Sequence, residues 1–498
     1  MKKKILVFAA MAMLSACTKD LTKLNVDPKH PQVVPSYTLF TTAENLMANN
    51  MTSVSENDNI TRLIEQQWTE VQYLTESQYN IPGRSIADGV WDEFYTGPLT
   101  NFEKAKGFMK TDVTDAGQLK NELAITDICE VYCFYYLVTT FGDIPYSEAF
   151  SPTITFPKYD KATTVYTDLL KRLDADIANL DPGSASFGTA DMIYGGDVAS
   201  WQKFANTFKL KMGILLADSD PTTAANTIAS ALDPSKGGIF TSNADNAMYH
   251  FASSPPYTNQ AWVGLVQSGR RDYVATDTYM TLLGSQNSST PGDPRTPYYF
   301  AQNKVGKYVG APNAVAPILY SNYSLPSGSE LTVGNSTGQQ PSIGTLANAD
   351  APGDLLDYSE TQFYLAEAAA RGLYTKGSTA ATYYANGITA SVEFWTGSTT
   401  GAAALIAAHP IGVGQAAQLQ AIAGQQYLAL YNRGYDAWTV NRRLDYPTLT
   451  PPPDAISAFP VRYTYPIKEQ QINAVNYKAA STSIGGDAVT TRLFFDTK

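Results

Sequence analysis

Two stretches rich in tyrosine and tryptophan carry side chains that could bind a ligand by stacking. The first spans residues 66–79, and the second lies within residues 251–352, where Gly, Pro, Ser, Asn and Tyr replace any regular periodicity. Exposed aromatic rings beside amide and charged groups can stack on a sugar or a peptide and orient it by hydrogen bonds. The candidate ligand-binding residues are Trp68, Tyr73, Tyr79, Tyr257, Asn259, Trp262, Arg270, Tyr308, Tyr320 and Tyr323.

Trp262 is the strongest candidate of this set. It follows the sequence SSPPYTNQ, and such turn-forming residues tend to present the next side chain at the surface. The chain contains 32 tyrosines, so packing in the core or within a loop is the alternative role for each of the other rings.

The sequence does not contain the patterns that catalysis would require. A His-Glu-x-x-His motif, a Gly-x-Ser-x-Gly motif and a phosphate-binding glycine loop are all missing. Asp88, Asp92 and Glu93 could form the carboxylate pair of a glycosidase, but their helical spacing predicts a solvated face. The three histidines are scattered along the chain. We therefore predict a protein that is not an enzyme and that holds no metal or cofactor.

The first 17 residues have the pattern of a lipoprotein signal. Lys2–Lys4 are followed by an apolar run at Ile5–Leu14 and by Leu14-Ser15-Ala16-Cys17, which matches a lipobox. The apolar run is too short to cross a bilayer as a helix, which needs about 20 residues. We predict that residues 1–16 are removed and that Cys17 is acylated, with several acyl chains making the attachment durable.

Composition limits what the rest of the chain can do. The 498 residues carry a formal net charge of -11, which argues against nucleic acid as a partner, because phosphate binding needs a clustered positive surface.

Cys129 and Cys133 lie four residues apart on a predicted helix, where Cβ atoms are about 5 to 6 Å apart. A disulfide needs about 3.5 to 4.5 Å, so we predict two reduced core cysteines.

The elements that must position these residues are mostly helices. Apolar stripes at helical spacing predict helices over 86–109, 119–141, 161–180, 198–217 and 358–374. Glu367 and Arg371 are one turn apart and should form an ion pair. Helices of this length in antiparallel pairs predict a mainly α fold, an α-solenoid in which each pair buries its stripe against the next.

The C-terminal part predicts a helix followed by a docked tail. Leu428, Tyr431 and Tyr435 can share one helix face, and Gly434 should loosen the end of that helix. Six prolines between residues 447 and 466 then favour an extended segment that lies against the folded body.

Several motifs resemble those of the SusD/RagB family, the outer-membrane lipoproteins of Bacteroidetes that bind nutrients for import. They comprise Gly142-Asp143-Ile144-Pro145-Tyr146, a helix with Trp201, Lys203, Phe204 and Ala205, Asp293-Pro294-Arg295, a helix with Tyr383, Tyr384, Gly387, Ile388, Ser391 and Trp395, and the series Asp436-Ala437-Trp438, Asn441-Arg442-Arg443, Tyr446-Pro447-Thr448-Leu449, Pro460, Arg462, Tyr465, Pro466, Glu469 and Asn473. We interpret these residues as structural. The resemblance implies four tetratricopeptide-like helix pairs with an irregular, loop-rich portion packed on one side.

The resemblance also implies a function. A SusD-like protein is expected to be lipid-anchored in the outer membrane, to bind an oligosaccharide, and to deliver it to a SusC-like TonB-dependent barrel transporter. Lys19-Asp20 after the cysteine is similar to a surface-export signal, so we expect the body to face the cell exterior, with the periplasmic face as the alternative. Three other functions stay open, namely a peptide-binding RagB-like importer subunit, a secreted glycan hydrolase and a structural surface-layer or adhesion module.

These patterns together predict the organisation of the chain. The predicted parts are a signal peptide at 1–16, a lipid-anchored tether at 17–35, an N-terminal helical-repeat part at 36–250, an irregular ligand-binding portion at 251–352, C-terminal helix pairs at 353–435 and a docked extended tail at 436–498.

Overall fold

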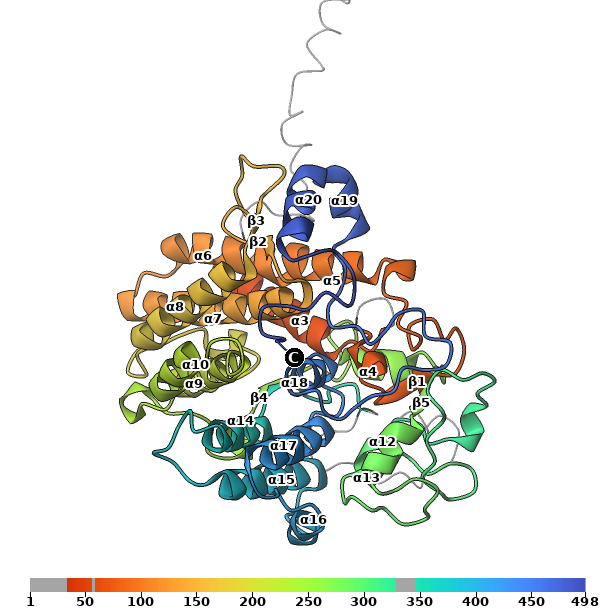
Figure 1. The fold of residues 1–498 in the computed structure, drawn as a ribbon. Helices are drawn as coiled ribbons and strands as arrows, with labels where there is room; N and C mark the ends of the chain where they lie inside the picture. Colours follow the sequence, from red (N-terminus) through yellow and green to blue (C-terminus); the bar gives the residue numbers. More distant parts are fainter. Residues whose placement is uncertain (1–33, 56–58, 328–345, 347, 498) are drawn as a thin grey trace, which may run out of the picture.

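The computed structural model of the protein describes residues 34–55, 59–327, 346 and 348–497. The predicted signal peptide, the Cys17 lipidation site and nearly all of the tether lie outside these described residues. Within them the protein is mainly helical, as Figure 1 shows, which confirms the predicted fold class.

Four helix pairs form the frame of the molecule. They are α3 (Ser36–Thr52) with α6 (Thr100–Asp112), α7 (Ala116–Phe141) with α8 (Ala162–Asn179), α9 (Val198–Leu215) with α10 (Pro221–Ala231), and α14 (Tyr358–Ala370) with α15 (Ala380–Thr396). Gly387 shows why α14 and α15 approach so closely, because a Cβ there would lie 2.9 Å from the Phe363 ring. The predicted ion pair on α14 is confirmed, with Arg371 Nε 2.7 Å from Glu367 Oε1.

The remaining helical elements are shorter or lie outside these pairs. They are α4 (Thr61–Ile64), η1 (Pro82–Arg84), α5 (Ile86–Phe94), η2 (Tyr95–Leu99), η3 (Gly188–Ala190), η4 (Pro234–Lys236), η5 (Asn243–Asp245), α11 (Gln260–Trp262), η6 (Val263–Gln267), α12 (Asp277–Leu282), α13 (Thr296–Tyr299), η7 (Tyr320–Asn322), α16 (Ala402–Ala408), α17 (Gln415–Ala429), α18 (Gly434–Leu444), α19 (Ile467–Ile472) and α20 (Ala474–Ser483).

Helix α7 lies at the centre of the N-terminal part. It is long and apolar enough to cross a bilayer, but it is almost completely buried inside the protein and is therefore a core helix. Cys129 and Cys133 lie on it as buried free thiols, in agreement with the prediction.

The prediction of a single helix over residues 86–109 is wrong. This segment is divided into α5, the π-helical turn η2 and α6, because Pro98 cannot donate a backbone hydrogen bond and Gly97 has non-helical angles of φ −84° and ψ −105°.

Six short strands form three antiparallel pairs among the described residues. They are β1 (Trp68–Glu70) with β5 (Tyr273–Ala275), β2 (Ile144–Pro145) with β3 (Tyr159–Asp160), and β4 (Ala247–Tyr249) with β6 (Gly353–Leu356). The β1–β5 and β4–β6 pairs join segments that are distant in the sequence, whereas β2 and β3 form a local hairpin between α7 and α8. The β1–β5 pair, with Trp68 opposite Ala275, brings the loop after β1 to the irregular portion.

The predicted C-terminal tail needs two corrections. The chain from residue 436 is not uniformly extended, since α18, α19 and α20 are helical. Gly434 does not end a helix but begins α18, and Leu428 and Tyr435 therefore lie on different helices. Its small size serves close packing, because a Cβ on Gly434 would lie 2.3 Å from Thr61 Oγ1 and 2.7 Å from Arg62 N.

The motif residues of this region hold the chain in place. Trp438 is fully buried and its indole N–H donates to Pro460 O at 2.7 Å. The guanidinium of Arg442 lies 3.6 Å from the Trp438 ring centroid and donates to Thr139 O at 2.6 Å. Their interpretation as structural residues agrees with this packing.

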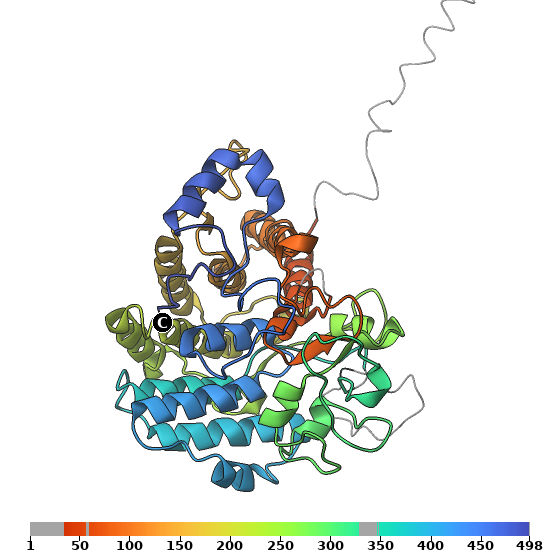
Figure 2. The same cartoon turned by 45° about the vertical axis from the view of Figure 1, so that its right-hand side comes forward.

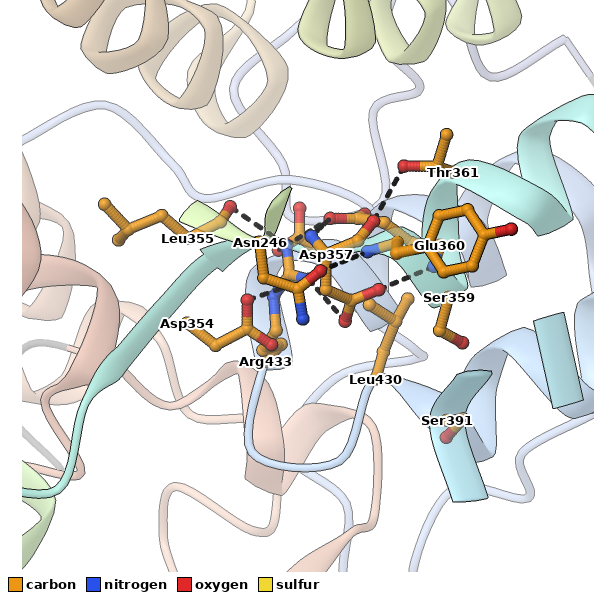
Figure 3. Close-up of polar contacts among 12 residues, drawn as sticks. Asn246, Asp354, Leu355, Asp357, Ser359, Glu360, Thr361, Ser391, Leu430 and Arg433 are labelled. Atoms are coloured by element: carbon orange, nitrogen blue, oxygen red, sulfur yellow. Dashed lines mark hydrogen bonds and ion pairs between the residues drawn. The ribbon is translucent and has the colours of Figure 1, made fainter. Parts of the chain in front are cut away.

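Buried charges join α14, α18 and α9. Figure 3 shows the part of this network around Arg433, Asp357 and Glu360. Arg433 Nη2 lies 2.7 Å from both Glu360 Oε1 and Asp436 Oδ2, and Arg433 Nη1 lies 3.2 Å from Asp357 Oδ2. Asp436 also pairs with Lys211 of α9. Burial opposes ionisation of Asp436, but Lys211 and Arg433 outweigh it and lower the pKa of this carboxyl. The three helices are therefore tied at one point by groups that cannot return to water.

Replacing Arg433 by leucine is expected to lower the free energy of unfolding by about 3–5 kcal/mol, because the carboxylates of Glu360 and Asp436 would stay buried with Lys211 as the cation left beside both of them. Urea unfolding followed by circular dichroism measures this change. Arg270→Leu is the matched control, since Arg270 pairs with Asp272 at 2.7 Å but is exposed, and an exposed pair contributes about 0–1 kcal/mol. Equal losses in both variants would contradict the role given to the buried network.

Candidate functional site

A loop of eight residues, 70–77, presents an aromatic ring to solvent directly after β1. Its two ends are joined by side chains: Glu70 N donates to Ser77 Oγ at 3.1 Å, and both Ser77 N and Ser77 Oγ donate to Glu70 Oε2 at 3.0 Å. Glu76 is also buried and pairs with Arg84 at 3.0 Å. Tyr73, between these anchors, is 76% exposed.

The backbone of this segment is strained. Gln66, Tyr73 and Tyr79 have φ values of 50°, 57° and 67°, in the left-handed region that residues other than glycine rarely adopt. Each such residue costs on the order of 1 kcal/mol or more, and strain of this kind concentrates where a side chain must be presented in one direction. At Tyr73 the result is an exposed ring on a closed loop.

Strand β5 brings the irregular portion to this loop. Val71 N donates to Asp272 O at 2.7 Å, next to the exposed Arg270, and Ala314 N donates to Thr69 Oγ1 at 2.9 Å. A small apolar cluster then fills the space between the loops. Its buried members are Val274, Ala311, Ile318 and Leu325, and its half-buried rim is Val71, Leu74, Tyr320 and Tyr323.

The C-terminal segment supports the loop from another side. Ile456 N donates to Gln78 O at 2.8 Å, and Ser457 Oγ donates to Tyr79 O at 3.2 Å. Gln66 Nε2 donates to Thr450 O at 2.7 Å. The loop after β1 is thus held by two segments that are distant from it in the sequence.

We call the exposed and half-buried side chains on these neighbouring segments the aromatic loop face. Its residues are Tyr73, Val315, Leu319, Tyr320, Tyr323 and Ile456. Of the predicted set, Tyr73, Arg270, Tyr320 and Tyr323 lie on these neighbouring segments. Sequence reasoning missed Val315, Leu319 and Ile456, because aliphatic residues in segments without periodicity give no signal of exposure.

Tyr257 and Trp262 belong to a second candidate surface. Tyr257 is 62% exposed and Trp262 is half-buried at the end of α11. Among the residues that the structure describes, the hydrogen bonds of this segment run to residues 349–351 rather than to the loop after β1. Both rings stay candidates for ligand contact.

The prediction that the side chain is exposed is wrong for four of the candidate ligand-binding residues. Trp68 is buried and donates its indole N–H to Tyr431 OH at 3.1 Å, and Tyr79 is buried with its hydroxyl accepting from Gln66 at 2.8 Å. Tyr308 is buried beside Ser288, to which its backbone N–H donates. Asn259 caps α11 and donates to Ala351 O at 2.8 Å. In each case it is the fold that brings the hydrogen-bond partner to the side chain or backbone of the residue.

The acidic groups near the site do not form an open catalytic pair. Asp88 is buried and accepts from the backbone N–H groups of Ile467 and Lys468 at 2.9 and 3.0 Å, so the prediction that it lies on a solvated face is wrong. Among residues 34–55, 59–327, 346 and 348–497, three or more His, Cys, Asp or Glu side chains do not gather as metal ligands would.

Burial raises the pKa of Glu70 to about 8, and the neighbouring Glu76 carboxylate adds to this effect. The folded protein therefore keeps a proton on Glu70 over a pH range in which the unfolded chain has lost it. The protonated carboxyl is compatible with the closed loop, whereas two carboxylates side by side repel each other.

The comparisons with known proteins come to the same family. A family model described as starch-binding proteins associating with the outer membrane, SusD-like, matches residues 28–466. A chitin-binding SusD homologue from Flavobacterium johnsoniae superposes with a TM-score of 0.76 at 21% identity, over 93% of this chain and 99% of that chain. A SusD homologue from Parabacteroides distasonis superposes with a TM-score of 0.76 at 20% identity, over 93% of this chain and 97% of that chain. A SusD homologue from Bacteroides vulgatus has a TM-score of 0.76 at 21% identity, over 92% of this chain and 97% of that chain.

A search of curated proteins finds no match. At about 20% identity the solved structures establish the fold of this chain, and the fold agrees with the helix pairs described above.

The closed loop is expected to lose stability as pH rises. Because the pKa of Glu70 is raised from 4.5 to about 8 in the folded state, its contribution to stability is present at low pH and declines between these values. Glu70→Gln keeps an oxygen acceptor for Ser77 without the titration, so its melting temperature should fall less than that of the wild type from pH 5 to pH 9. Scanning calorimetry measures both curves. Glu103→Gln, an exposed carboxyl on α6, should follow the wild type.

Proposed function

Because the chain belongs to the SusD-like family of starch-binding proteins that associate with the outer membrane, we propose that it is a surface lipoprotein that binds an oligosaccharide without cleaving it. It then passes the sugar to a SusC-like TonB-dependent barrel transporter. A peptide ligand is the alternative within the same family.

The aromatic loop face is the observation that supports ligand binding here. Tyr73 stands exposed on a closed loop, and Tyr320 and Tyr323 line the rim of the adjacent apolar cluster. Rings fixed in this way can stack on a pyranose with little loss of side-chain entropy. Arg270 and the exposed Gln72 provide donors at the edge of the same surface.

A glycan is the ligand class favoured by the relatives. The family description names starch, and two solved relatives are described as chitin-binding. Both polysaccharides present pyranose faces with equatorial hydroxyl or acetamido groups, which suit aromatic rings flanked by amides. An array of starch and chitin oligosaccharides is therefore the first set of ligands to titrate.

Tyr73→Ala is expected to weaken oligosaccharide binding by about 1–3 kcal/mol, roughly 5- to 150-fold, the effect of losing one well-placed aromatic anchor. Isothermal titration calorimetry with the tightest ligand of the array measures the change. Tyr37→Ala is the matched control, because Tyr37 is also an exposed tyrosine (53%) but lies at the start of α3, outside the aromatic loop face.

Trp262→Ala extends the same titration to the second candidate surface, and Trp262→Phe should restore binding if the ring stacks. A loss in Trp262→Ala without a loss in Tyr73→Ala would move the ligand from the aromatic loop face to this surface. Unchanged binding in both alanine variants, with an unchanged melting temperature, would contradict both assignments.

The partner is tested by isolating the protein from its native outer membrane in mild detergent. A large β-barrel protein should co-purify in a stoichiometric amount, and mass spectrometry should find acyl chains on Cys17. Release of new reducing ends from the same oligosaccharides would instead support the hydrolase alternative. A chain that is recovered without acyl groups and without a barrel would contradict the proposed transport role.

A further inference from the structure

A cavity of about 520 Å³ opens to solvent between α12, α17 and the loop that follows α16. Figures 1 and 2 both show α12 beside α17, with α16 below them. Tyr279 OH of α12 donates to Leu428 O of α17 at 3.2 Å and joins the two helices. Binding sites for small ligands have volumes of about 300–1,000 Å³, so the cavity is large enough for one. We call it the α12–α17 cavity.

The lining of the α12–α17 cavity carries no acidic group and no lysine or arginine. Among the described residues that line it, none is Asp, Glu, Lys or Arg, although these four types make up 16% of the sequence. Leu282, Ile411 and Leu428 give it an apolar wall. A charged ligand would lose its hydration here without an opposite charge to replace it. The cavity therefore suits an uncharged ligand.

Small residues on one face of α17 make room for a ring. Ala417, Ala421 and Gly424 are spaced by four and three residues, so they share this face, and all three line the cavity. A Cβ on Gly424 would lie 3.0 Å from Tyr446 Cε1, so the glycine lets the half-buried Tyr446 ring lie against the helix. An aromatic ring thus stands beside a shallow helix face.

Gln425 places a hydrogen-bond donor in the same wall. Its side chain is 4% exposed, and its Oε1 accepts from Arg295 Nη2 at 3.2 Å. Because arginine can only donate, the amide oxygen must face Arg295, and the NH₂ group is left on the other side. This NH₂ group has no hydrogen-bond partner among the described residues. Such a group is costly to bury unless water or a ligand accepts from it.

The direction of this donor is fixed before any ligand arrives. Arg295 is fully buried, its Nη2 lies 2.7 Å from Asp293 Oδ2, and its Nη1 donates to Ser391 Oγ at 2.8 Å. The Asp293-Pro294-Arg295 motif therefore holds the amide of Gln425 in one orientation. A donor that is already oriented loses little entropy when it binds.

Three more polar side chains line the α12–α17 cavity, namely Thr281, Gln420 and Tyr446. In the part of the chain that the structure describes, none of them forms a side-chain hydrogen bond. A hydrocarbon ligand would leave these groups and the Gln425 amide unpaired. A pyranose offers an apolar C–H face to the wall and hydroxyl groups to the amides and hydroxyls.

The α12–α17 cavity lies near the closed loop but is a separate site. Thr278 Oγ1, in the first turn of α12, donates to Gln66 Oε1 at 3.2 Å, and Thr281 at the end of this helix lines the cavity. Gln66 Nε2 donates to Thr450 O, and Tyr446 of the same segment lines the cavity. Two short segments therefore lead from the base of the closed loop to the cavity, and no residue of the aromatic loop face lines it.

We infer that the α12–α17 cavity is a second ligand site, which binds one uncharged pyranose unit. The choice of a sugar rests on the proposed function, whereas the exclusion of charged ligands rests on the lining alone. Tyr446 and the aliphatic wall cover the apolar face of the sugar. The NH₂ group of Gln425 donates to a hydroxyl or acetamido oxygen at its edge.

The test places a reporter at the cavity itself. The chain from residue 18 onward carries Ala408→Cys with a trifluoromethyl tag, which reacts there because Cys129 and Cys133 are buried. Ala408 is exposed and lines the cavity. Methyl glucoside and the methyl glycoside of N-acetylglucosamine are added, and fluorine NMR should show a shift that saturates for at least one of them. Methyl glucuronide, the same ring with a carboxylate, should give no saturating shift.

Two variants of the tagged protein assign the shift to the α12–α17 cavity. Ala417→Phe fills the opening with a ring and should abolish the shift. Ala416→Phe is the matched control, because Ala416 is also exposed on α17 but does not line the cavity, and it should leave the shift unchanged. Gln425→Leu should raise the half-saturating sugar concentration about 2- to 10-fold, the effect of losing one hydrogen bond.

Three results would overturn the inference when the melting temperatures of the variants are unchanged. They are no saturating shift with either neutral sugar, an equal response to methyl glucuronide, and a shift that persists in Ala417→Phe. A larger response to the uncharged peptide N-acetyl-dialanine amide than to the sugars would assign the cavity to a peptide and would also reject the sugar.

The design separates this inference from the proposed function. Calorimetry of Tyr73→Ala reports on the aromatic loop face, while the fluorine tag reports on the α12–α17 cavity. A fluorine shift without an effect of Tyr73→Ala would reject the aromatic loop face only. An effect of Tyr73→Ala without a fluorine shift would reject the second site only, and the absence of both would reject sugar binding at either place.

Discussion

Buried charge is the constraint on which the rest of this structure depends. Arg433 and Lys211 are both buried with the carboxylates of Asp436 and Glu360, and each charge is tolerable only in the presence of the others. A second buried pair, Arg443 Nη2 with Glu367 Oε2 at 2.6 Å, joins α18 to α14 again. Apolar packing alone would allow these helices to slide, whereas buried, paired ions allow one position.

The buried ion network also helps to position the candidate site. Helix α18 starts at Gly434, which lies so close to α4 that a Cβ would meet Thr61, and α4 leads within a few residues to β1. The closed loop follows β1 directly. Of its other supports, the segment after Pro447 follows α18 directly, and β5 pairs with β1. An exposed tyrosine is thus connected to a buried ion network by short, well-packed steps.

The helices could be predicted from the sequence and the site only in part. Apolar stripes gave α8, α9 and α14 nearly in full, because one buried face is a local property of a periodic sequence. The family, recognised from motifs such as Asp436-Ala437-Trp438, is confirmed by the model match over residues 28–466. The breaks were missed: Pro98 gives a local signal, the missing backbone donor, whereas Gly434 acts through the packing around it.

The exposure of individual side chains could not be predicted where the sequence has no clear periodicity, and the reason is physical. Without periodicity, the side of the chain that faces water is decided by partners distant in the sequence. Trp68 is buried because Tyr431 lies 363 residues away to accept its N–H, while Tyr73, five residues later, is exposed. Asp88 likewise looks like a surface carboxylate until α19 returns to it after 379 residues.

The strain at Tyr73 argues for a role beyond stability. A left-handed residue on a solvent-exposed loop is cheapest as glycine or asparagine, which adopt this conformation at little cost. A tyrosine there adds strain and also leaves a large ring in water, and neither effect is repaid by contacts within the chain when 76% of the side chain is exposed. A bound sugar face would cover the ring and remove the cost of its exposure, and the strained loop has already fixed the ring in its bound orientation. Stability alone gives no reason for tyrosine at this position, whereas ligand binding does.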